Sequence, residues 1–85
     1  MIWTVRLSKS AFKFLQNCPA DVRRRAIHRI EELEKGPFPR GCLRLRGRPD
    51  VWRLRLGHYR IVYRILWQET TVLVFRIEPR ARAYQ

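Results

Sequence analysis

The amino-acid sequence predicts a small α+β domain, in the order β-α-α-β-β-β, in which two N-terminal helices pack on one face of an antiparallel sheet. Residues 52–65 read WRLRLGHYRIVYRI, and this alternation of apolar and basic residues around a glycine is typical of two adjacent strands. Apolar residues recur at helical spacing in residues 8–18 and 20–35, upstream of those strands. Helices that precede a run of strands favour an α+β architecture.

We expect residues 1–85 to form a single domain, because 85 residues support one hydrophobic core. Hydrophobic residues make up 46% of the chain, which indicates a globular protein despite its charge. No apolar run approaches the roughly 20 residues of a membrane span. The first residues, MIWTVRLSKS, lack the apolar segment of a secretory signal, so a cytoplasmic location without membrane contact is expected.

The first 36 residues are predicted to contain a strand and two helices. Residues 2–7 alternate as a strand does, and Ser8 then offers a hydroxyl N-cap for a first helix that Pro19 ends. A second helix is expected to begin near Ala20–Asp21, where the acid suits the positive helix N-terminus, and to stop at Gly36. Its predicted apolar stripe consists of Val22, Ala26, Ile27, Ile30 and Leu33, with Arg23 among the residues left to solvent.

The remaining strands follow in order. CLRLR gives a short strand, VWRLRLG a longer one that ends at Gly57, HYRIVYRILW the next, and residues 72–78 the last, which Pro79 halts. Alternation then divides the sheet into two faces. The apolar face is predicted to contain Trp52, Leu54, Tyr59, Ile61, Leu73, Phe75 and Ile77. The opposite face is predicted to contain Arg53, Arg55, His58, Arg60, Arg64 and Arg76.

The charge of the chain indicates a polyanionic partner. The formal net charge is +12, and sixteen of the nineteen basic residues are arginine. Residues 1–39 are net +4, whereas residues 40–85 are net +8. A planar guanidinium binds phosphate with two hydrogen bonds and stacks on bases, so nucleic acid is the first expectation and an acidic protein the second. A membrane surface is disfavoured, because the basic residues have strand spacing rather than that of an amphipathic helix.

Metal and redox chemistry find no support in the sequence. Cys18 and Cys42 form no CxxC or Cys/His pattern, so both are predicted to be ordinary thiols. No cluster of acids, histidines and cysteines has metal-ligand spacing. We therefore expect no metal and no small-molecule cofactor.

Two segments of the chain carry a family pattern. VWRLRLGHYRIVYRI combines a basic alternating strand with Gly57 and the run Tyr59–Tyr63, and VLVFRIEPRARAY ends in Arg80 and Tyr84. Together they resemble the core of the RelE/ParE toxin superfamily, the toxic halves of prokaryotic toxin–antitoxin pairs. The resemblance extends along essentially the whole chain, and it implies a RelE-like fold and a cognate antitoxin protein as partner.

The resemblance also implies an activity. RelE-type members are ribosome-dependent endonucleases that cut mRNA in the decoding site, whereas ParE-type members poison DNA gyrase without being nucleases. We expect the former: a metal-independent mRNA endonuclease that blocks translation, with mRNA and the ribosome as further partners. The alternatives are a ParE-like gyrase poison and a catalytically inactive RNA-binding member of the same fold.

Candidate site residues follow from the matched positions. The resemblance implies catalytic roles for Arg53, Arg55, Arg60, Arg80 and Tyr84. RNA-binding roles are expected for Arg44, Arg46, His58, Arg64, Arg76 and Arg82. The chain departs from the family in one respect, since Arg53 and Arg55 occupy strand positions that are often lysine.

The expected chemistry requires a general base, and the sequence does not identify it. RNA cleavage without a metal uses the adjacent 2′-hydroxyl as nucleophile, and it needs a base, charge for the extra negative oxygen and an acid for the leaving oxygen. Arginines on a rigid sheet supply the charge. A guanidinium, with a pKa above ~12, is a poor base. The base is therefore left open among His58, Glu78, the Tyr84 hydroxyl and a ribosomal group.

Overall fold

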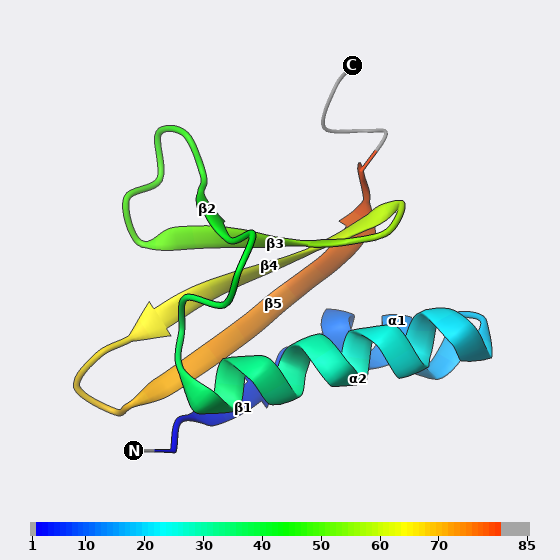
Figure 1. The fold of residues 1–85 in the computed structure, drawn as a ribbon, viewed down its shortest axis with the longest axis horizontal. Coiled ribbons are helices and arrows are strands. Elements are labelled where there is room, and N and C mark those ends of the chain that lie inside the picture. Colours follow the sequence, from blue (N-terminus) through cyan, green and yellow to red (C-terminus); the bar gives the residue numbers. More distant parts are fainter. Residues whose placement is uncertain (1, 81–85) are drawn as a thin grey trace.

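Five strands form one sheet, and two helices cover one of its faces (Figure 1). The computed structural model describes residues 2–80. Its elements are β1 (Thr4–Leu7), α1 (Lys9–Asn17), α2 (Ala20–Lys35), β2 (Leu43–Arg44), β3 (Val51–Leu56), β4 (Tyr59–Leu66) and β5 (Thr71–Pro79). The predicted α+β class, with two helices on one face of the sheet, is confirmed. The predicted order β-α-α-β-β-β has one strand too few, because four strands follow the helices once the short strand β2 is counted. Within residues 2–80, no helix is long and apolar enough to cross a membrane.

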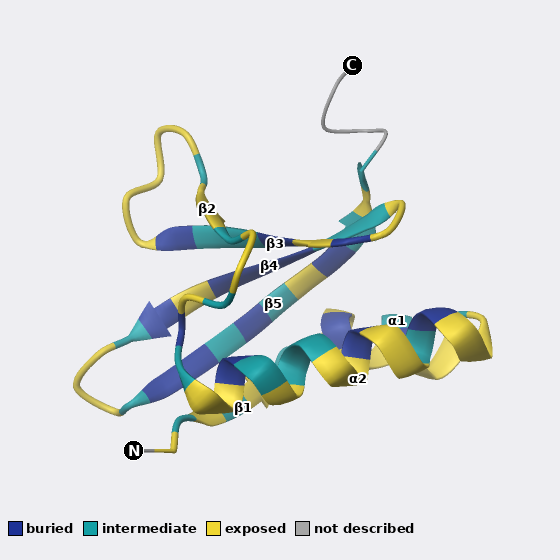
Figure 2. Ribbon diagram, viewed as in Figure 1, coloured by how far each residue is buried: buried dark blue, intermediate teal, exposed yellow. Residues whose placement is uncertain are grey.

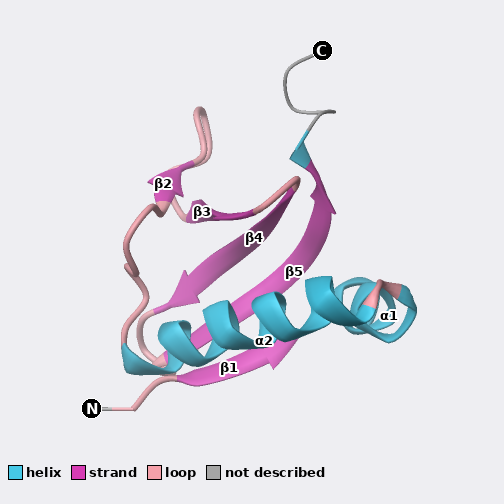
Figure 3. Ribbon diagram, turned by 45° about the vertical axis from the view of Figure 1, so that its right-hand side comes forward, coloured by secondary structure: helices cyan, strands magenta, loops and turns pink. Residues whose placement is uncertain are grey.

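The strand order across the sheet is β1-β5-β4-β3-β2. Strands β2 to β5 pair antiparallel with their neighbours, whereas β1 pairs parallel with β5. Figure 3 shows β1 beside β5, with α2 crossing the sheet. The two helices return the chain to the start of β1, where the Trp3 amide donates to the Glu34 carbonyl at 2.8 Å. The loop of residues 36–42 then crosses to the far edge of the sheet, where β2 begins (Figure 1). Alternation in the sequence reveals the faces of a strand but not its direction of pairing, so this parallel pair was not foreseen.

The start of α1 is tied to the sheet by Ser8. The Ser8 hydroxyl accepts a hydrogen bond from the Ala11 amide at 3.1 Å, as predicted for an N-cap, and donates one to the Phe75 carbonyl at 2.8 Å. At the other end of α1, Arg23 donates to the carbonyls of Leu15 at 2.8 Å and Cys18 at 3.2 Å. Arg23 is therefore partly buried between the helices, and the expectation that it faces solvent is wrong.

The buried face of α2 is narrower than predicted. Val22, Ala26 and Leu33 are buried and Ile30 is partly buried, but Ile27 is 45% exposed. Ile27 follows Ala26 directly, and one helical step turns its side chain about 100° away from the sheet. Figure 2 shows the buried residues of both helices on the side toward the sheet.

A β-bulge in β5 changes which of its residues enter the core. Ile77 lies opposite Ile61, but Tyr63 lies opposite Val74, so Phe75 is an extra residue on β5. Past this point the alternation is shifted by one residue. The core therefore takes Val72 and Val74 instead of Leu73 and Phe75, and the prediction for those two is wrong. The other predicted members of the apolar face lie in or against the core: Trp52, Leu54, Tyr59, Ile61 and Ile77.

Tyr63 links the sheet to the loop that follows α2. Its side chain is fully buried, and its hydroxyl donates a hydrogen bond to the Pro37 carbonyl at 2.7 Å. Replacing Tyr63 with phenylalanine is expected to lower the free energy of unfolding by about 1–2 kcal/mol, because the Pro37 carbonyl loses its partner. Urea unfolding of both proteins measures this difference.

The same variant tests the alkaline stability of the protein. Burial raises the pKa of Tyr63 above its usual value near 10. The unfolded chain therefore releases this proton first as the pH rises, and the contribution of the group, complete below pH ~10, declines above it. We expect Tyr63→Phe to show a shallower loss of stability above pH ~10 than the wild type. An equally steep loss in both proteins would contradict this assignment.

Candidate functional site

Four of the predicted site residues converge on one concave surface. Arg53 and Arg55 come from β3, Arg60 from β4, and Arg80 from just beyond β5. With Gly41 and Leu43 they line a cavity of about 270 Å³, which we call the arginine cavity. Strand alternation places the first three on one face, opposite the helices, as the sequence predicted.

The β3–β4 hairpin brings Arg80 to this cavity. The Arg80 amide donates to the His58 carbonyl at 2.7 Å, and its guanidinium Nη1 donates to the Gly57 carbonyl at 3.1 Å. Gly57 has a φ of +56°, a conformation that glycine adopts without strain. The glycine of the predicted motif thus makes the tight turn that holds Arg80 next to the strand arginines.

An ion pair borders the arginine cavity. Arg60 Nε donates to Glu78 Oε2 at 2.6 Å, and Arg60 Nη2 also contacts this oxygen. The two side chains are 18% and 20% exposed. Glu78 Oε1 lies 3.4 Å from Nη1 of Arg76, which is mostly exposed. No local sequence pattern indicates that Glu78 contacts Arg60, because that contact depends on the register of β4 against β5.

The electrostatics of the arginine cavity favour an anion. Arg55 and Arg60 lie directly opposite each other on β3 and β4, and like charges in that position repel. Within residues 2–80, neither Arg53 nor Arg55 forms an ion pair with a carboxylate. A phosphate group in this cavity would relieve the repulsion and accept charge-assisted hydrogen bonds. Of the described residues, none that line the cavity is a histidine or an acid, so this part of the site supplies charge but no general base.

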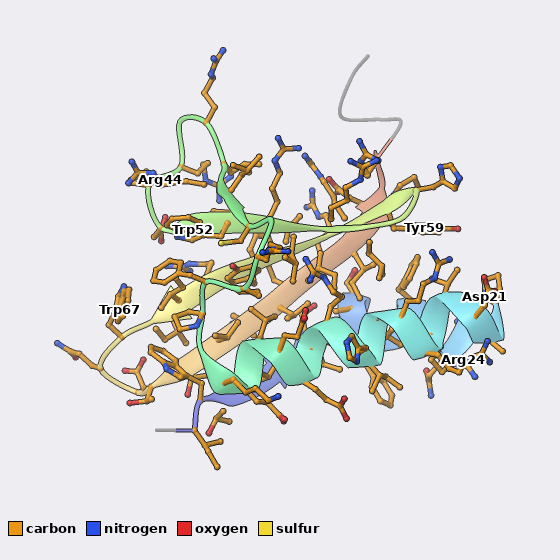
Figure 4. All side chains as sticks on the ribbon, viewed as in Figure 1. Asp21, Arg24, Arg44, Trp52, Tyr59 and Trp67 are labelled. Atoms are coloured by element: carbon orange, nitrogen blue, oxygen red, sulfur yellow. The ribbon has the colours of Figure 1, made fainter. Side chains whose placement is uncertain are left out.

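The other predicted residues lie elsewhere. Arg44 lies opposite Trp52, on the side of the sheet away from Arg53, and its guanidinium is 6.0 Å from the Trp52 ring centroid. Figure 4 shows Arg44 and Trp52 at one end of the sheet, with Tyr59 at the other. Arg46 is exposed in the β2–β3 loop, and His58 is exposed in the β3–β4 turn. Arg64, on β4, pairs with Asp50.

Two predicted residues cannot be placed. Tyr84 and Arg82 lie outside the described residues, so their roles stay predictions. The RNA-binding roles of Arg44, Arg46, His58, Arg64 and Arg76 also stay predictions. Within residues 2–80, no group of three or more histidine, cysteine, aspartate or glutamate side chains is arranged to hold a metal ion. Among those same residues, Cys18 and Cys42 are free thiols, as predicted.

The sequence and the fold are similar to those of known toxins. Residues 5–84 match the family model described as ParE toxin of type II toxin–antitoxin system, parDE. The chain is 30% identical to a protein named putative toxin RelE1 from Methanocaldococcus jannaschii, over all of this chain and 98% of the relative. It is 32% identical to toxin RelG from Mycobacterium tuberculosis, over all of this chain and 99% of that protein.

A solved structure shows the same architecture. The archaeal RelE–RelB complex from Pyrococcus horikoshii contains a chain that superposes with a TM-score of 0.84 and 32% sequence identity. The match covers 96% of this chain and 99% of the other. The likeness therefore extends over the helices, the sheet and the strands that carry the arginine cavity.

Proposed function

This chain belongs to the RelE/ParE superfamily of type II toxin–antitoxin toxins, and we propose that it is a ribosome-dependent, metal-independent mRNA endonuclease that blocks translation. The observation that carries the proposal is the arginine cavity, where Arg53, Arg55, Arg60 and Arg80 surround about 270 Å³. A phosphodiester is the ligand that such a set of guanidiniums suits.

The proposed reaction begins with attack of the 2′-hydroxyl on the adjacent phosphorus. The cavity arginines bind the phosphate and stabilise the additional negative charge that develops on its oxygens. As the bond from the 2′-oxygen to phosphorus forms a 2′,3′-cyclic phosphate, the bond from phosphorus to the 5′-oxygen breaks. A cavity arginine donates a hydrogen bond to that leaving oxygen, which takes its proton from water. The proton of the 2′-hydroxyl goes to a group beyond the described cavity lining: His58, Glu78, Tyr84 or a ribosomal group. The described cavity lining supplies charge but no base, which supports a contribution from the ribosome.

A second candidate function is poisoning of DNA gyrase. The matching family model carries the ParE name, which favours this candidate. The full-length relatives at 30% and 32% identity carry the names RelE1 and RelG, which favour the nuclease. The arginine cavity supports the nuclease proposal, because a gyrase poison does not require a phosphate-binding cavity at the matched positions.

We also propose a cognate antitoxin as partner in the cytoplasm. The similar chain from Pyrococcus horikoshii was solved in complex with RelB. The net charge of +12 exceeds the magnitude of roughly 2–8 at which small soluble domains are usually comfortable. An acidic or amphipathic antitoxin segment over the arginine face would neutralise this charge and exclude RNA. Affinity that falls steeply with added salt would support this mode over docking on the helices.

The decisive experiment compares translated with free mRNA. Purified protein is incubated with the same message either alone or on programmed ribosomes, and the RNA ends are mapped. Cleavage on the ribosome alone is the expected result. If induction in cells instead gives DNA breaks and an SOS response with intact messages, the protein is a gyrase poison. Intact RNA and intact DNA together would leave only the inactive RNA-binding member.

A further inference from the structure

We infer that Glu78 is a positioning residue for the proposed cleavage, because its carboxylate holds the Arg60 guanidinium in the orientation that an RNA phosphate requires. The inference rests on the proposed function and extends it to a residue outside the lining of the arginine cavity. Arg60 and Glu78 are direct neighbours in the register of β4 and β5. A rigid sheet therefore sets the distance between them.

The hydrogen-bond geometry shows which edge of Arg60 is occupied. Glu78 Oε2 accepts from Arg60 Nε at 2.6 Å and also contacts Nη2. Nε and Nη2 form one edge of the planar guanidinium, so the edge formed by Nη1 and Nη2 stays available for a phosphate. Because the two side chains are only 18% and 20% exposed, solvent and salt screen this pair less than a surface pair.

The neighbours of Arg60 on β3 and β5 together set the orientation of its guanidinium. Arg55, Arg60 and Glu78 lie in one row across β3, β4 and β5. The repulsion between the two arginines directs the Arg60 side chain away from Arg55, toward β5. Glu78 lies on that side, and its carboxylate binds the guanidinium there. The carboxylate therefore fixes one orientation of Arg60 before RNA arrives, which is the preorganisation that charge stabilisation requires.

The same contacts favour a holding role over that of general base. Glu78 Oε2 faces Arg60, and Glu78 Oε1 lies 3.4 Å from Arg76 Nη1. Glu78 does not line the arginine cavity, whereas Arg60 does. Both carboxylate oxygens thus face guanidinium groups, and Glu78 lies outside the lining of the cavity in which we propose that the phosphate binds.

Glu78 has opposite effects on binding and on reaction. Its negative charge beside the cavity weakens attraction to RNA, while its hold on Arg60 favours cleavage. Removing the charge should therefore tighten RNA binding and slow cleavage at the same time. A residue that only stabilises the fold would instead lower both quantities together, so this split separates a positioning role from a structural one.

The test uses the full chain with Glu78→Gln and Glu78→Ala. Single-turnover cleavage is measured on programmed ribosomes, and binding is measured with a 2′-O-methyl RNA that cannot be cut. We expect Glu78→Gln to lower the cleavage rate by about 10-fold to 10²-fold, as a misplaced group does. We expect binding to tighten by about 2- to 10-fold, because one negative charge is lost. Glutamine is nearly the size of glutamate, so this variant remains usable if Glu78→Ala fails to fold.

Asp50→Asn is the matched control. Asp50 pairs with Arg64 at 2.9 Å, and strand alternation places Arg64 on the same face of β4 as Arg60. The change in charge is the same, but these side chains are 47% and 54% exposed and do not line the arginine cavity. Its cleavage rate should stay at the wild-type value.

Three results for the Glu78→Gln protein would overturn the inference while leaving the nuclease proposal intact. The variant could cleave at the wild-type rate, it could lose cleavage rate and RNA affinity to the same extent, or its cleavage rate could lose the pH dependence seen in the wild type. The last result would make Glu78 the base. A wild-type protein that does not cleave on the ribosome would overturn the proposed function, and the inference with it.

Discussion

Replacing Arg60 with alanine is expected to slow mRNA cleavage on the ribosome by about 10²–10³-fold and to abolish toxicity, because one preorganised charge contact to the phosphate is lost. Arg60 lines the arginine cavity, lies opposite Arg55 and is held by Glu78. Single-turnover cleavage on programmed ribosomes and growth after induction measure the two effects. Arg80→Ala should behave similarly, since Arg80 lines the same cavity.

Arg64→Ala is the matched control for Arg60→Ala. Arg64 is on the same strand and face, and it also pairs with one carboxylate, but it does not line the arginine cavity. The two variants lose the same charge, so non-specific attraction to RNA falls equally in both. Thermal unfolding of both proteins shows whether each fold survives. Full toxicity of a soluble Arg60→Ala protein would count decisively against a nuclease site at the arginine cavity.

Local patterns in the sequence predicted the elements well. The Ser8 cap, the ends of both helices and the faces of β3 and β4 lie where spacing and turn residues placed them. The errors arose where a non-local contact overrides a local pattern. The bulge at Phe75 is a feature of the pairing of β5 with β4, and it puts Val72 and Val74 in the core in place of Leu73 and Phe75. Strand direction and register depend on the whole sheet.

The candidate site shows the same division. Alternation was sufficient to place Arg53, Arg55 and Arg60 on one face, and the family pattern added Arg80. Neither pattern could show that Leu43 and Gly41 wall the cavity, because they reach it through the loop after α2. Positive charge alone does not identify the residues of the cavity, since Arg44 lies against Trp52 on the other side of the sheet. Glu78 appeared in the sequence only as a candidate base, and the register of β4 and β5 makes it the partner of Arg60.

The arginine cavity depends on the core beneath it. Leu54 lies between Arg53 and Arg55 in the sequence, so its side chain enters the core while theirs face the cavity. Any change that loosens β3 on the helix side therefore also moves the guanidiniums on the other side. Because of this coupling, effects on stability and on activity are separated by comparing two variants, one that changes the core and one that changes the cavity.

Leu54→Ala is expected to lower the free energy of unfolding by about 2–5 kcal/mol, because a fully buried leucine leaves a cavity among the packed residues. For a domain of this size, such a loss lowers the melting temperature by on the order of 10–30 °C. Leu43→Ala is the control, because Leu43 is 55% exposed on the neighbouring strand. Its free energy of unfolding should change by no more than about 0.5 kcal/mol. Calorimetry or urea unfolding measures both.

The two leucine variants should also differ in how their mRNA cleavage relates to their stability. Leu54→Ala should lose cleavage in proportion to its unfolded fraction, and cooling below its melting temperature should restore much of that loss. Leu43 lines the arginine cavity, so Leu43→Ala should alter the cleavage rate while the melting temperature stays constant. If Leu54→Ala were as stable as the wild type, the helix-facing side of β3 would not be the main core of this domain. The rigid support proposed for the arginines would then lack its physical basis.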